Sequence, residues 1–313
     1  MITIVYACDN SYVRQTLISM VSVVMHNQNV KFYLIADRLS TLNKELISSI
    51  MQKYEIAICY LDVDSVLPEL DLDEADRHPR TIYTKLFLSE AILEDRVLYL
   101  DSDTVVKESL ESLFNRKMDC ELVAGVMMPY SSKIKNRVFA QQGQPYICDG
   151  IVLINMQLWR KERISDICKQ FISEHRGKPP MLSEGTLNHV CQGKIGILEP
   201  KYNLMPSMIM YSMKQMIQLF KADCYYQNED AMQHAKSNPV VIHFMKELYN
   251  RPWFTPCEHP FLEEYRNIEK RVFGENKTKH IPLTWHTRIT VLMKKKLPFK
   301  LFAAMYHLKN KED

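Results

Sequence analysis

Apolar runs and amphipathic segments alternate along the first 61 residues of this chain of 313. Runs that suit buried strands cover 2–7, 31–36 and 55–61, and segments with apolar residues at helical spacing cover 12–27 and 41–54. This β-α-β-α-β order predicts parallel strands joined by right-handed crossovers. We therefore expect an α/β fold with a mixed, mostly parallel sheet flanked by helices.

The rest of the chain continues this pattern. Further strands are expected at 96–100, 122–127, 146–156, 195–198 and 240–244, and helices at 81–93, 109–115 and 157–174. Residues 203–238 are expected to be mostly helical, with their six methionines filling the core. Asn10 or Ser11 is expected to cap the first helix, and Ser183 a short later one.

The composition argues against several classes of protein. No stretch is apolar over the roughly 18 residues of a membrane-spanning helix, and the N-terminus lacks a basic signal-peptide segment. Eight cysteines without a Cys-x-x-Cys pair argue against a zinc ribbon and for a reducing cytosol. A net charge of +3 gives no nucleic-acid signature. The absence of G-x-G-x-x-G argues against a classical dinucleotide fold.

Two carboxylates follow the apolar run at 97–100. Asp101 and Asp103 come directly after it, where the carboxyl end of a buried strand would place them at the ligand-binding edge of an α/β sheet. Two such carboxylates repel each other unless a cation lies between them, so a hard divalent metal is the simplest partner. The spacing alone is weak evidence, because Asp62 and Asp64 also follow an apolar run.

Six segments, in the same order, resemble glycosyltransferase family 8, the retaining transferases with a GT-A fold. They are ACDNSY (7–12), YTKLFLSE (83–90), RVLYLDSDTVV (96–106), YICDGIVLINMQLWR (146–160), SEGTLN (183–188) and VIHF followed by RPW (241–253). Each segment is weak alone, but the combination is specific. The resemblance implies a GT-A domain over residues 1–275, a UDP-sugar donor, and Mn²⁺ or Mg²⁺ as the metal.

The resemblance also assigns roles to individual residues. Asp101, Asp103 and His243 would bind the metal, and this ligand set suits manganese better than calcium; a buried structural histidine is the alternative for His243 alone. The donor nucleotide and its diphosphate would be bound by Ala7, Asp9, Asn10, Lys85, Asp101, Ser102, Lys246 and Arg251. For Asp9 and Asn10 the alternative is a simple helix cap.

The sugar-facing positions depart from the family's pattern. Lys85 stands where arginine is usual, which keeps the charge but loses the bidentate geometry. Cys148 replaces an asparagine, and Asp149 follows it where a small residue is usual. Ser183 and Glu184 replace an Asp-Gln pair. A further lysine, at position 246, replaces a glycine.

Glu184 and Asp149 are the candidate catalytic residues. A glutamate in place of glutamine would be able to act as the nucleophile of a double displacement, or to stabilise an oxocarbenium-like centre. The alternative is that Glu184 only hydrogen-bonds the hydroxyl groups of the donor sugar. No residue of the sequence stands out as a general base.

The last segment, 276–313, differs in character from the rest. Residues 288–311 carry seven Lys or Arg and no acid, interleaved with apolar and aromatic residues. A basic amphipathic segment is typical of binding to an anionic membrane surface. We therefore expect a helical extension and a cytoplasmic protein on the inner face of the cell membrane. A docked helix with a solvated basic face is the alternative.

The resemblance thus implies a hexosyltransferase that moves glucose or galactose from a UDP-sugar to a lipopolysaccharide, capsule or other cell-surface glycan, or to a lipid-linked acceptor. Two other classes stay open. The altered sugar-facing positions would also suit a non-catalytic sugar-nucleotide or glycan-binding protein. A sugar-1-phosphate nucleotidyltransferase would need a glycine-rich, arginine-bearing loop after the first strand, and ACDNSYVR has none.

Overall fold

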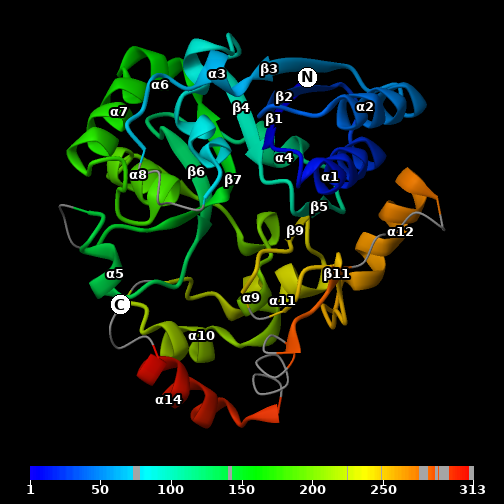
Figure 1. The fold of residues 1–313 in the computed structure, drawn as a ribbon. Coiled ribbons are helices and arrows are strands. Elements are labelled where there is room, and N and C mark those ends of the chain that lie inside the picture. The colour runs from blue at the N-terminus through cyan, green and yellow to red at the C-terminus, as the bar shows by residue number, and fades with distance from the viewer. Residues whose placement is uncertain are drawn as a thin grey trace.

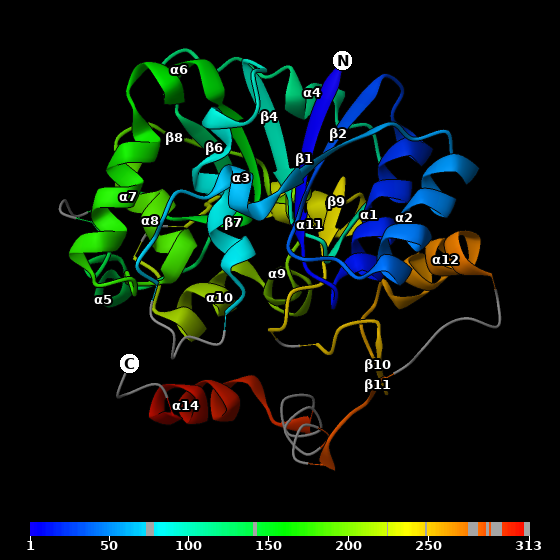
Figure 2. The same cartoon turned by 45° about the horizontal axis from the view of Figure 1, so that its top comes forward.

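The structure is a computed structural model that describes residues 1–72, 78–139, 143–223, 225–247, 249–274, 281–285, 288 and 296–309. A seven-stranded sheet in the order β3-β2-β1-β4-β7-β6-β8 lies at the centre of this described part (Figures 1 and 2). Its strands are β1 (Ile2–Cys8), β2 (Val30–Ala36), β3 (Ile58–Asp62), β4 (Arg96–Leu100), β6 (Val123–Met127), β7 (Ile147–Asn155) and β8 (Ile195–Ile197).

The sheet is mixed and mostly parallel, as the sequence predicts. β3, β2, β1 and β4 pair in parallel, and β8 is parallel to β6. β7 runs antiparallel to both β4 and β6. Residues 97–100 of β4 are at most 2% exposed, which confirms the buried central strand.

Helices cover both faces of the sheet. One hydrophobic cluster joins the sheet to α1 (Val13–His26) and α2 (Thr41–Lys53), and the other joins it to α6 (Met156–Lys161), α7 (Ile164–Glu174) and α8 (Leu182–Val190). Figure 2 shows these two groups on opposite sides of the strands. Shorter elements follow the chain between them: α3 (Val63–Val66), α4 (Glu111–Phe114) and α5 (Ser132–Lys135).

Several predicted elements differ in detail. Residues 81–93 do not form one helix but two 3₁₀ helices, η1 (Arg80–Leu86) and η2 (Leu88–Glu90), and Leu93 is 85% exposed. The helix predicted at 157–174 is broken at Arg163, whose φ of 56° is left-handed. The third strand begins at Ile58, three residues later than expected.

Both predicted helix caps are wrong. Tyr12 is the N-cap of α1 and makes no side-chain capping bond, because the Asn10 side chain bonds elsewhere. Met181 is the N-cap of α8, so Ser183 lies within the helix. The Ser183 hydroxyl donates to the carboxylate of Asp149 instead. Asn10 and Ser183 were both predicted to cap a helix, but each side chain forms its hydrogen bonds with residues of other segments.

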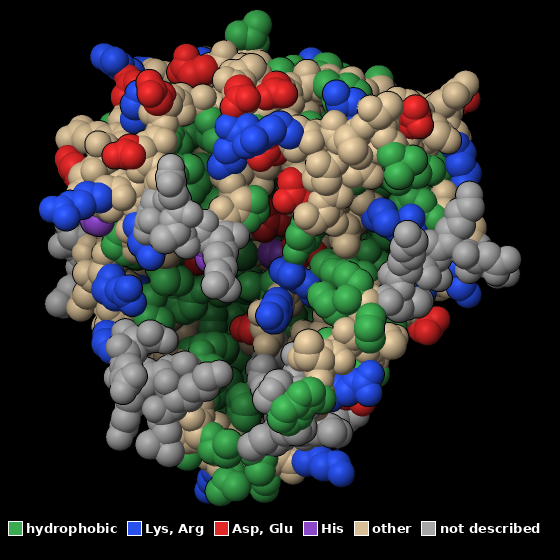
Figure 3. Space-filling model, in the orientation of Figure 1, with side chains coloured by type: hydrophobic (Ala, Val, Ile, Leu, Met, Phe, Trp, Pro, Cys, Tyr) green, Lys and Arg blue, Asp and Glu red, His purple; other side chains and the backbone are tan. Residues whose placement is uncertain are grey.

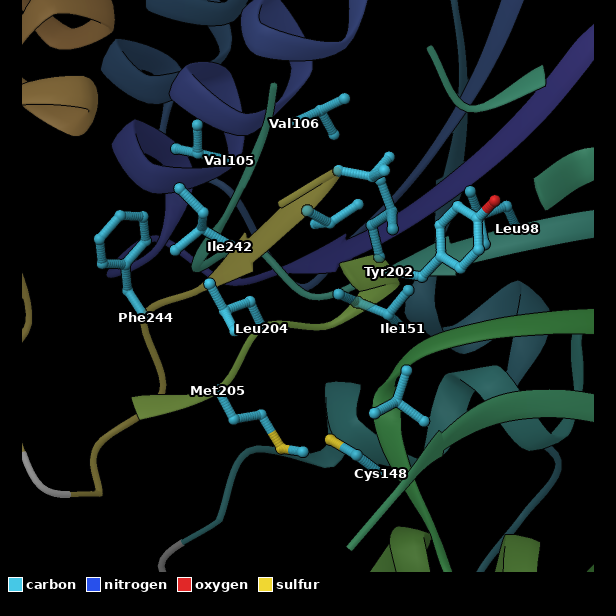
Figure 4. Close-up of a cluster of buried hydrophobic side chains, with 14 of the residues drawn as sticks. Leu98, Val105, Val106, Cys148, Ile151, Tyr202, Leu204, Met205, Ile242 and Phe244 are labelled. Atoms are coloured by element: carbon cyan, nitrogen blue, oxygen red, sulfur yellow. The ribbon is translucent and has the colours of Figure 1, made fainter. Parts of the chain in front are cut away.

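A second layer packs below the carboxyl edge of the sheet. It contains the two-stranded pair of β5 (Thr104–Val106) with β9 (Val241–His243), the 3₁₀ helix η3 (Pro200–Tyr202), and the helices α9 (Pro206–Met210), α10 (Met213–Phe220), α11 (Glu229–Ser237) and α12 (Leu262–Phe273). Figure 4 shows Val105, Ile242 and Leu204 near one another within the hydrophobic cluster. Five of the six methionines predicted to fill this core are buried: Met205, Met208, Met213, Met216 and Met232.

The C-terminal helix α14 (Phe299–Lys309) is docked on α10. Phe302 and Ala303 are buried, and the Phe299 ring lies 5.3 Å from that of Tyr211. Farther along, His307 contacts the backbone oxygen of Leu219 through Nε2 (2.9 Å). Among the described residues, no helix is both long enough and apolar enough to span a bilayer. Most of residues 286–295, on which much of the basic-tail prediction falls, lie outside the described residues.

Candidate active site

Asp101, Asp103 and His243 converge at the end of the central strand. β4 ends at Leu100, and the chain turns through Asp101 and Asp103 into β5. β5 pairs with β9 so that Thr104 lies opposite His243, which brings the imidazole to the carboxylates. One ligand atom from each of the three side chains lies within 4.8 Å of the others.

The orientation of His243 suits metal binding. Its Nδ1 lies 3.0 Å from Asn203 Oδ1, an acceptor, so Nδ1 carries the proton and Nε2 points to Asp103 Oδ1 at 3.1 Å. A second hydrogen bond of this kind fixes the tautomer of metal-binding histidines. Gly150 allows the close approach, because an added Cβ would lie 2.5 Å from His243 Cε1 and 2.6 Å from Asp101 Oδ2.

The site concentrates charge in a buried place. Burial raises the pKa of Asp101 to about 6, with Lys85 opposing the shift. Burial opposes the ionised form of Asp103 as well, but His243 and Arg251 outweigh it and hold the pKa of Asp103 below its usual value. Burial likewise disfavours a charged His243, but the Asp103 carboxylate raises the pKa of His243 well above its usual value. These opposed charges are the environment that a divalent cation would complete.

A second cluster lies beside the first. The Lys85 ammonium, 4% exposed, lies 2.9 Å from Asp149 Oδ2 and 3.6 Å from Asp101 Oδ1. The same Asp149 oxygen accepts from the Ser183 hydroxyl at 2.9 Å. Lys85 therefore links a carboxylate of the central strand to one of β7.

A cavity of about 260 Å³ opens next to Asp101 and Asp103. Its lining brings together Ala7, Cys8, Asp9, Tyr12, His78, Pro79, Thr81, Ile82, Tyr99, Asp101, Ser102, Asp103 and Arg251. Arg251 lies 3.2 Å from Asp103 and above the rings of Tyr12 and Trp253. Figure 3 shows this face of the molecule hollowed at its centre, where basic, acidic and histidine side chains surround an apolar floor.

Five of the eight predicted donor-binding residues line this cavity: Ala7, Asp9, Asp101, Ser102 and Arg251. Local hydrogen bonds position three of them, Ala7, Asp9 and Ser102. Asp9 Oδ1 accepts from the backbone N–H of Ser11 in a tight turn after β1. The Ser102 hydroxyl lies 2.8 Å from that of Thr16 and 3.4 Å from the backbone oxygen of Ala7. These bonds tie the Asp-Ser-Asp turn to the end of β1 and the start of α1.

Two other predicted residues lie away from the cavity. The Asn10 amide donates to Arg38 O and accepts from Ser40 N and Asn43 Nδ2, which joins two loops. Lys246 is exposed on the segment after β9.

Glu184 lies on α8 close to Asp149. Burial raises the pKa of Glu184 to about 8, and the Asp149 charge adds to the shift. The Tyr146 hydroxyl, the backbone of Asp149 and the Lys85 charge act in the opposite direction. At neutral pH the side chain is therefore a neutral carboxylic acid.

The competing pair Asp62 and Asp64 has a structural role. Asp62 caps α3 by accepting from the backbone N–H of Asp64, and Asp64 is paired with Arg80. Arg80 also contacts Asp37 at 2.8 Å. The pair thus stabilises the edge of the sheet at β3, away from His243.

Sequence reasoning missed two residues of the site. Tyr12 falls inside the ACDNSY segment, but the sequence assigns no role to its ring. In the structure the ring lies beneath Arg251. Asn203 lies outside every recognised segment, and only its contact with His243 identifies it.

Comparison with known proteins agrees with this architecture. Residues 3–257 match the model of Glycosyl transferase family 8. General stress protein A of Bacillus subtilis is 25% identical over 271 residues, which cover 84% of this chain and 91% of that protein. The lipopolysaccharide 1,2-glucosyltransferase of Escherichia coli is 26% identical over 274 residues, covering 84% of this chain and 76% of the relative.

A solved structure shares the fold. The galactosyltransferase LgtC, in complex with donor and acceptor sugar analogues, superposes with a TM-score of 0.71 at 18% identity. The likeness covers 88% of this chain and 98% of LgtC. The sheet and its flanking helices therefore form a GT-A fold, as the sequence predicts.

Proposed function

The chain belongs to glycosyltransferase family 8, and on that premise we propose that it transfers a hexose, glucose or galactose, from a UDP-sugar with retention at the anomeric carbon. Enzymes of this family use UDP-sugar donors and a divalent metal. The proposed acceptor is a lipopolysaccharide, capsule or other cell-surface glycan, or a lipid-linked sugar. The similarity to a lipopolysaccharide glucosyltransferase supports this class of acceptor.

One observation carries the proposal. Two carboxylates and an imidazole lie within 4.8 Å of one another, at the wall of a cavity that also contains Asp9 and Arg251. A nucleotide diphosphate needs both a cation and a basic residue at this place, and the cavity offers three possible ligands for a cation together with Arg251.

The three side chains fit a divalent metal. Oxygen ligands and one imidazole suit manganese, with magnesium as the second choice. The contact of His243 with Asn203 leaves Nε2 directed at the site, and the missing Cβ of Gly150 leaves room for the ligands to approach. When bound, such a metal would offset the negative charge that develops on the departing UDP.

The other charged residues would hold the donor. Arg251, beside Asp103 and between two aromatic rings, is placed to contact the diphosphate with its fork of N–H groups. Asp9, Ala7 and Ser102 would bind the nucleoside end of the donor. Lys246, three residues after His243, would reach the diphosphate from the rim. Asn10 would support this end of the site through its loop contacts.

We assign Glu184 to the donor sugar. With its raised pKa the side chain offers one donor and one acceptor, as a glutamine does. A neutral acid is a poor nucleophile, so this state favours hydrogen bonding to sugar hydroxyl groups over a double displacement. Asp149, the neighbouring carboxylate, would complete the sugar-facing side.

We also propose that residues 1–275 form the catalytic unit and 276–313 an extension that holds the protein on the inner face of the cell membrane, in the cytoplasm. The inner face of α14 is used for docking, but Leu301 and Met305 on its outer face are 55% and 41% exposed. Lys296 and Lys300 lie near them in the chain. Apolar and basic side chains together suit an anionic lipid surface.

The test is release of UDP from a panel of UDP-hexoses, without acceptor, in the presence of Mn²⁺. We expect release from one donor, and its loss on addition of EDTA and in Asp103→Asn. Asp64→Asn is the matched control, because Asp64 belongs to the structural Asp62–Asp64 pair. Metal-dependent binding of UDP without release from any donor, with or without acceptor glycans, would contradict the proposed transfer.

A further inference from the structure

One carboxylate on the sugar side of this site stands at a different position from that of the family's pattern. That pattern has a small residue at 149 and an aspartate at 183, whereas this chain has Asp149 and Ser183. We propose that Asp149, held by Lys85 and Ser183, is the residue that selects one hydroxyl group of the donor hexose. The inference rests on the proposed function and names its specificity-determining residue.

β7 is irregular where it carries Asp149. Gly125 of β6 pairs with Val152, and Met127 pairs with Ile147, so a step of two residues in β6 spans five in β7. Bulges of this kind redirect side chains and are common beside active sites. The extra residues of β7 include Asp149, whose side chain reaches η1 and α8.

Three contacts hold the carboxylate in one orientation. Lys85 Nζ lies 2.9 Å from Asp149 Oδ2 and 3.0 Å from the backbone oxygen of the same residue. Ser183 Oγ donates to the same Oδ2 at 2.9 Å. Among the described residues, no hydrogen-bond donor is recorded for Oδ1, and the Asp149 side chain is 12% exposed against 4% for Lys85. One oxygen is thus fixed, and the other is free to accept a hydrogen bond.

A fixed carboxylate oxygen is a selective acceptor for a sugar hydroxyl. Hydrogen bonds to an ionised acceptor are stronger than neutral ones, and a site built for a hydroxyl group discriminates against a donor that lacks it. Lys85 forms an ion pair with Asp149 at 2.9 Å and also lies 3.6 Å from Asp101. Through Lys85, the position of the Asp149 carboxylate therefore depends on that of Asp101, which follows β4. Glu184, in its neutral form, is left to contact a different hydroxyl group.

The experiment pairs Asp149→Asn with donors that lack single hydroxyl groups. We would measure kcat/KM for donor hydrolysis with UDP-glucose, UDP-galactose and their deoxy analogues, and the affinity for UDP by calorimetry. We expect Asp149→Asn to lower kcat/KM for the preferred donor by roughly 10- to 100-fold. The same change should have no effect with the one analogue that lacks the recognised hydroxyl, and the UDP affinity should stay unchanged.

A second variant moves the carboxylate back to α8. Asp149→Ala combined with Ser183→Asp should regain at least tenfold of the activity that Asp149→Ala loses. The matched control is Asp223→Asn, which removes the partner of Lys135, another lysine that is only 4% exposed. We expect that control to leave the ratio between donors unchanged.

Two results would overturn the inference. One is an equal loss with every donor and with UDP, which would mean that Asp149 only stabilises the fold. The other is a double variant no better than Asp149→Ala. If Asp149→Asn does not fold, Ser183→Ala tests the same ratio of kcat/KM between the preferred donor and its deoxy analogues. The expected change in that ratio is then smaller, about several-fold. Absence of hydrolysis by the wild type would reject the proposed function separately, and calorimetry with UDP-hexoses would still test Asp149.

Discussion

Gly150 is the residue on which the arrangement of Asp101 and His243 depends most directly. A side chain at this position would enter the space between the carboxylate and the imidazole ring. The requirement is for space and not for backbone freedom, because Gly150 is not among the glycines with positive φ. The smallest side chain is therefore already too large.

We expect Gly150→Ala to lower the affinity for Mn²⁺ at least tenfold, because the new Cβ would lie 2.5 Å from His243 and push it away from Asp101. Calorimetric titration of the metal in the presence of UDP measures this. Gly193→Ala is the control, since a Cβ there meets no atom within 4 Å and only a left-handed φ of 78° is disturbed. Equal metal affinity in the two variants would count against the assigned site.

Glu184 gives the enzyme a predicted response to alkaline pH. Its pKa of about 8 keeps it neutral below that pH, and above it a second negative charge forms beside Asp149. We expect kcat/KM for donor hydrolysis to fall about tenfold per pH unit above pH 8. Glu184→Gln stays neutral and should lose this decline while keeping near-normal turnover at pH 7. The charged or titratable groups that face Glu184 include Asp149, Tyr146, Lys85, Tyr130 and Cys148.

The same shift affects stability. The pKa of Glu184 is higher in the folded protein than its usual value of 4.5, so folding is favoured by protonation. This contribution is present at low pH and is lost as the pH rises through about 8. Urea denaturation at pH 4 and pH 9 should show Glu184→Gln gaining stability relative to the wild type at the higher pH, because the contribution is lost between the unfolded pKa of 4.5 and the folded pKa of about 8. An unchanged difference between the two pH values would argue against the neutral acid.

At the scale of elements, α14 has two apolar faces with different uses. Phe299 and Phe302 pack on Tyr211, and Tyr306 packs on Phe220. The outer face keeps Leu301 and Met305 exposed. The docked helix therefore presents its remaining apolar side chains together, without unfolding from α10.

We expect Leu301→Asp combined with Met305→Asp to reduce sedimentation with vesicles containing anionic phosphatidylglycerol by severalfold, because both apolar area and charge attraction are lost. The control is Leu42→Asp on α2, which changes a leucine that is 74% exposed on another helix. Equal binding of the wild type to neutral and anionic vesicles would exclude the electrostatic part of the proposal.

Helices and strands could be predicted from the sequence where the spacing and length of the apolar segments favoured one type of element. β1, β2 and α1 agree with their predicted ranges within a residue or two, because β1 and β2 are short, mostly apolar runs and α1 is a longer segment with apolar residues at helical spacing. The prediction of an α-helix at η1 was wrong because the residues of η1 are buried on nearly all sides. The spacing of apolar residues therefore did not distinguish a 3₁₀ helix from an α-helix. The break in the helix at Arg163 was not predicted, because no glycine or proline marks it in the sequence.

The whole molecule brings together side chains that are far apart in the sequence. Asp103 and His243 are 140 residues apart, and Lys85 and Asp149 are 64 apart. The resemblance to the family made the first grouping predictable, together with Asp101, but it did not predict the contact of Lys85 with Asp149. The path of β7, the fixed orientation of Asp149 and the contact of Asn203 with His243 were not predictable either, because they depend on register and on packing between distant elements.

Binding at the site should stabilise the entire fold. The complex of Mn²⁺ with UDP, counted as one ligand at about 100 times its dissociation constant, would add about 2.7 kcal/mol to the free energy of unfolding. We expect a rise in Tm of several degrees by calorimetry with both ligands, and its loss with EDTA. Asp103→Asn should show no rise. A rise with UDP alone that equals the rise with both ligands would contradict metal-dependent binding.

The pairing of β5 with β9 has a consequence for protein synthesis. Until His243 leaves the ribosome, the nascent chain contains the two carboxylates of the central strand but not their third partner. Chains that terminate early, or that are cut before β9, would therefore lack a complete set of metal ligands. Metal binding by all three side chains therefore becomes available only after β9 has been translated.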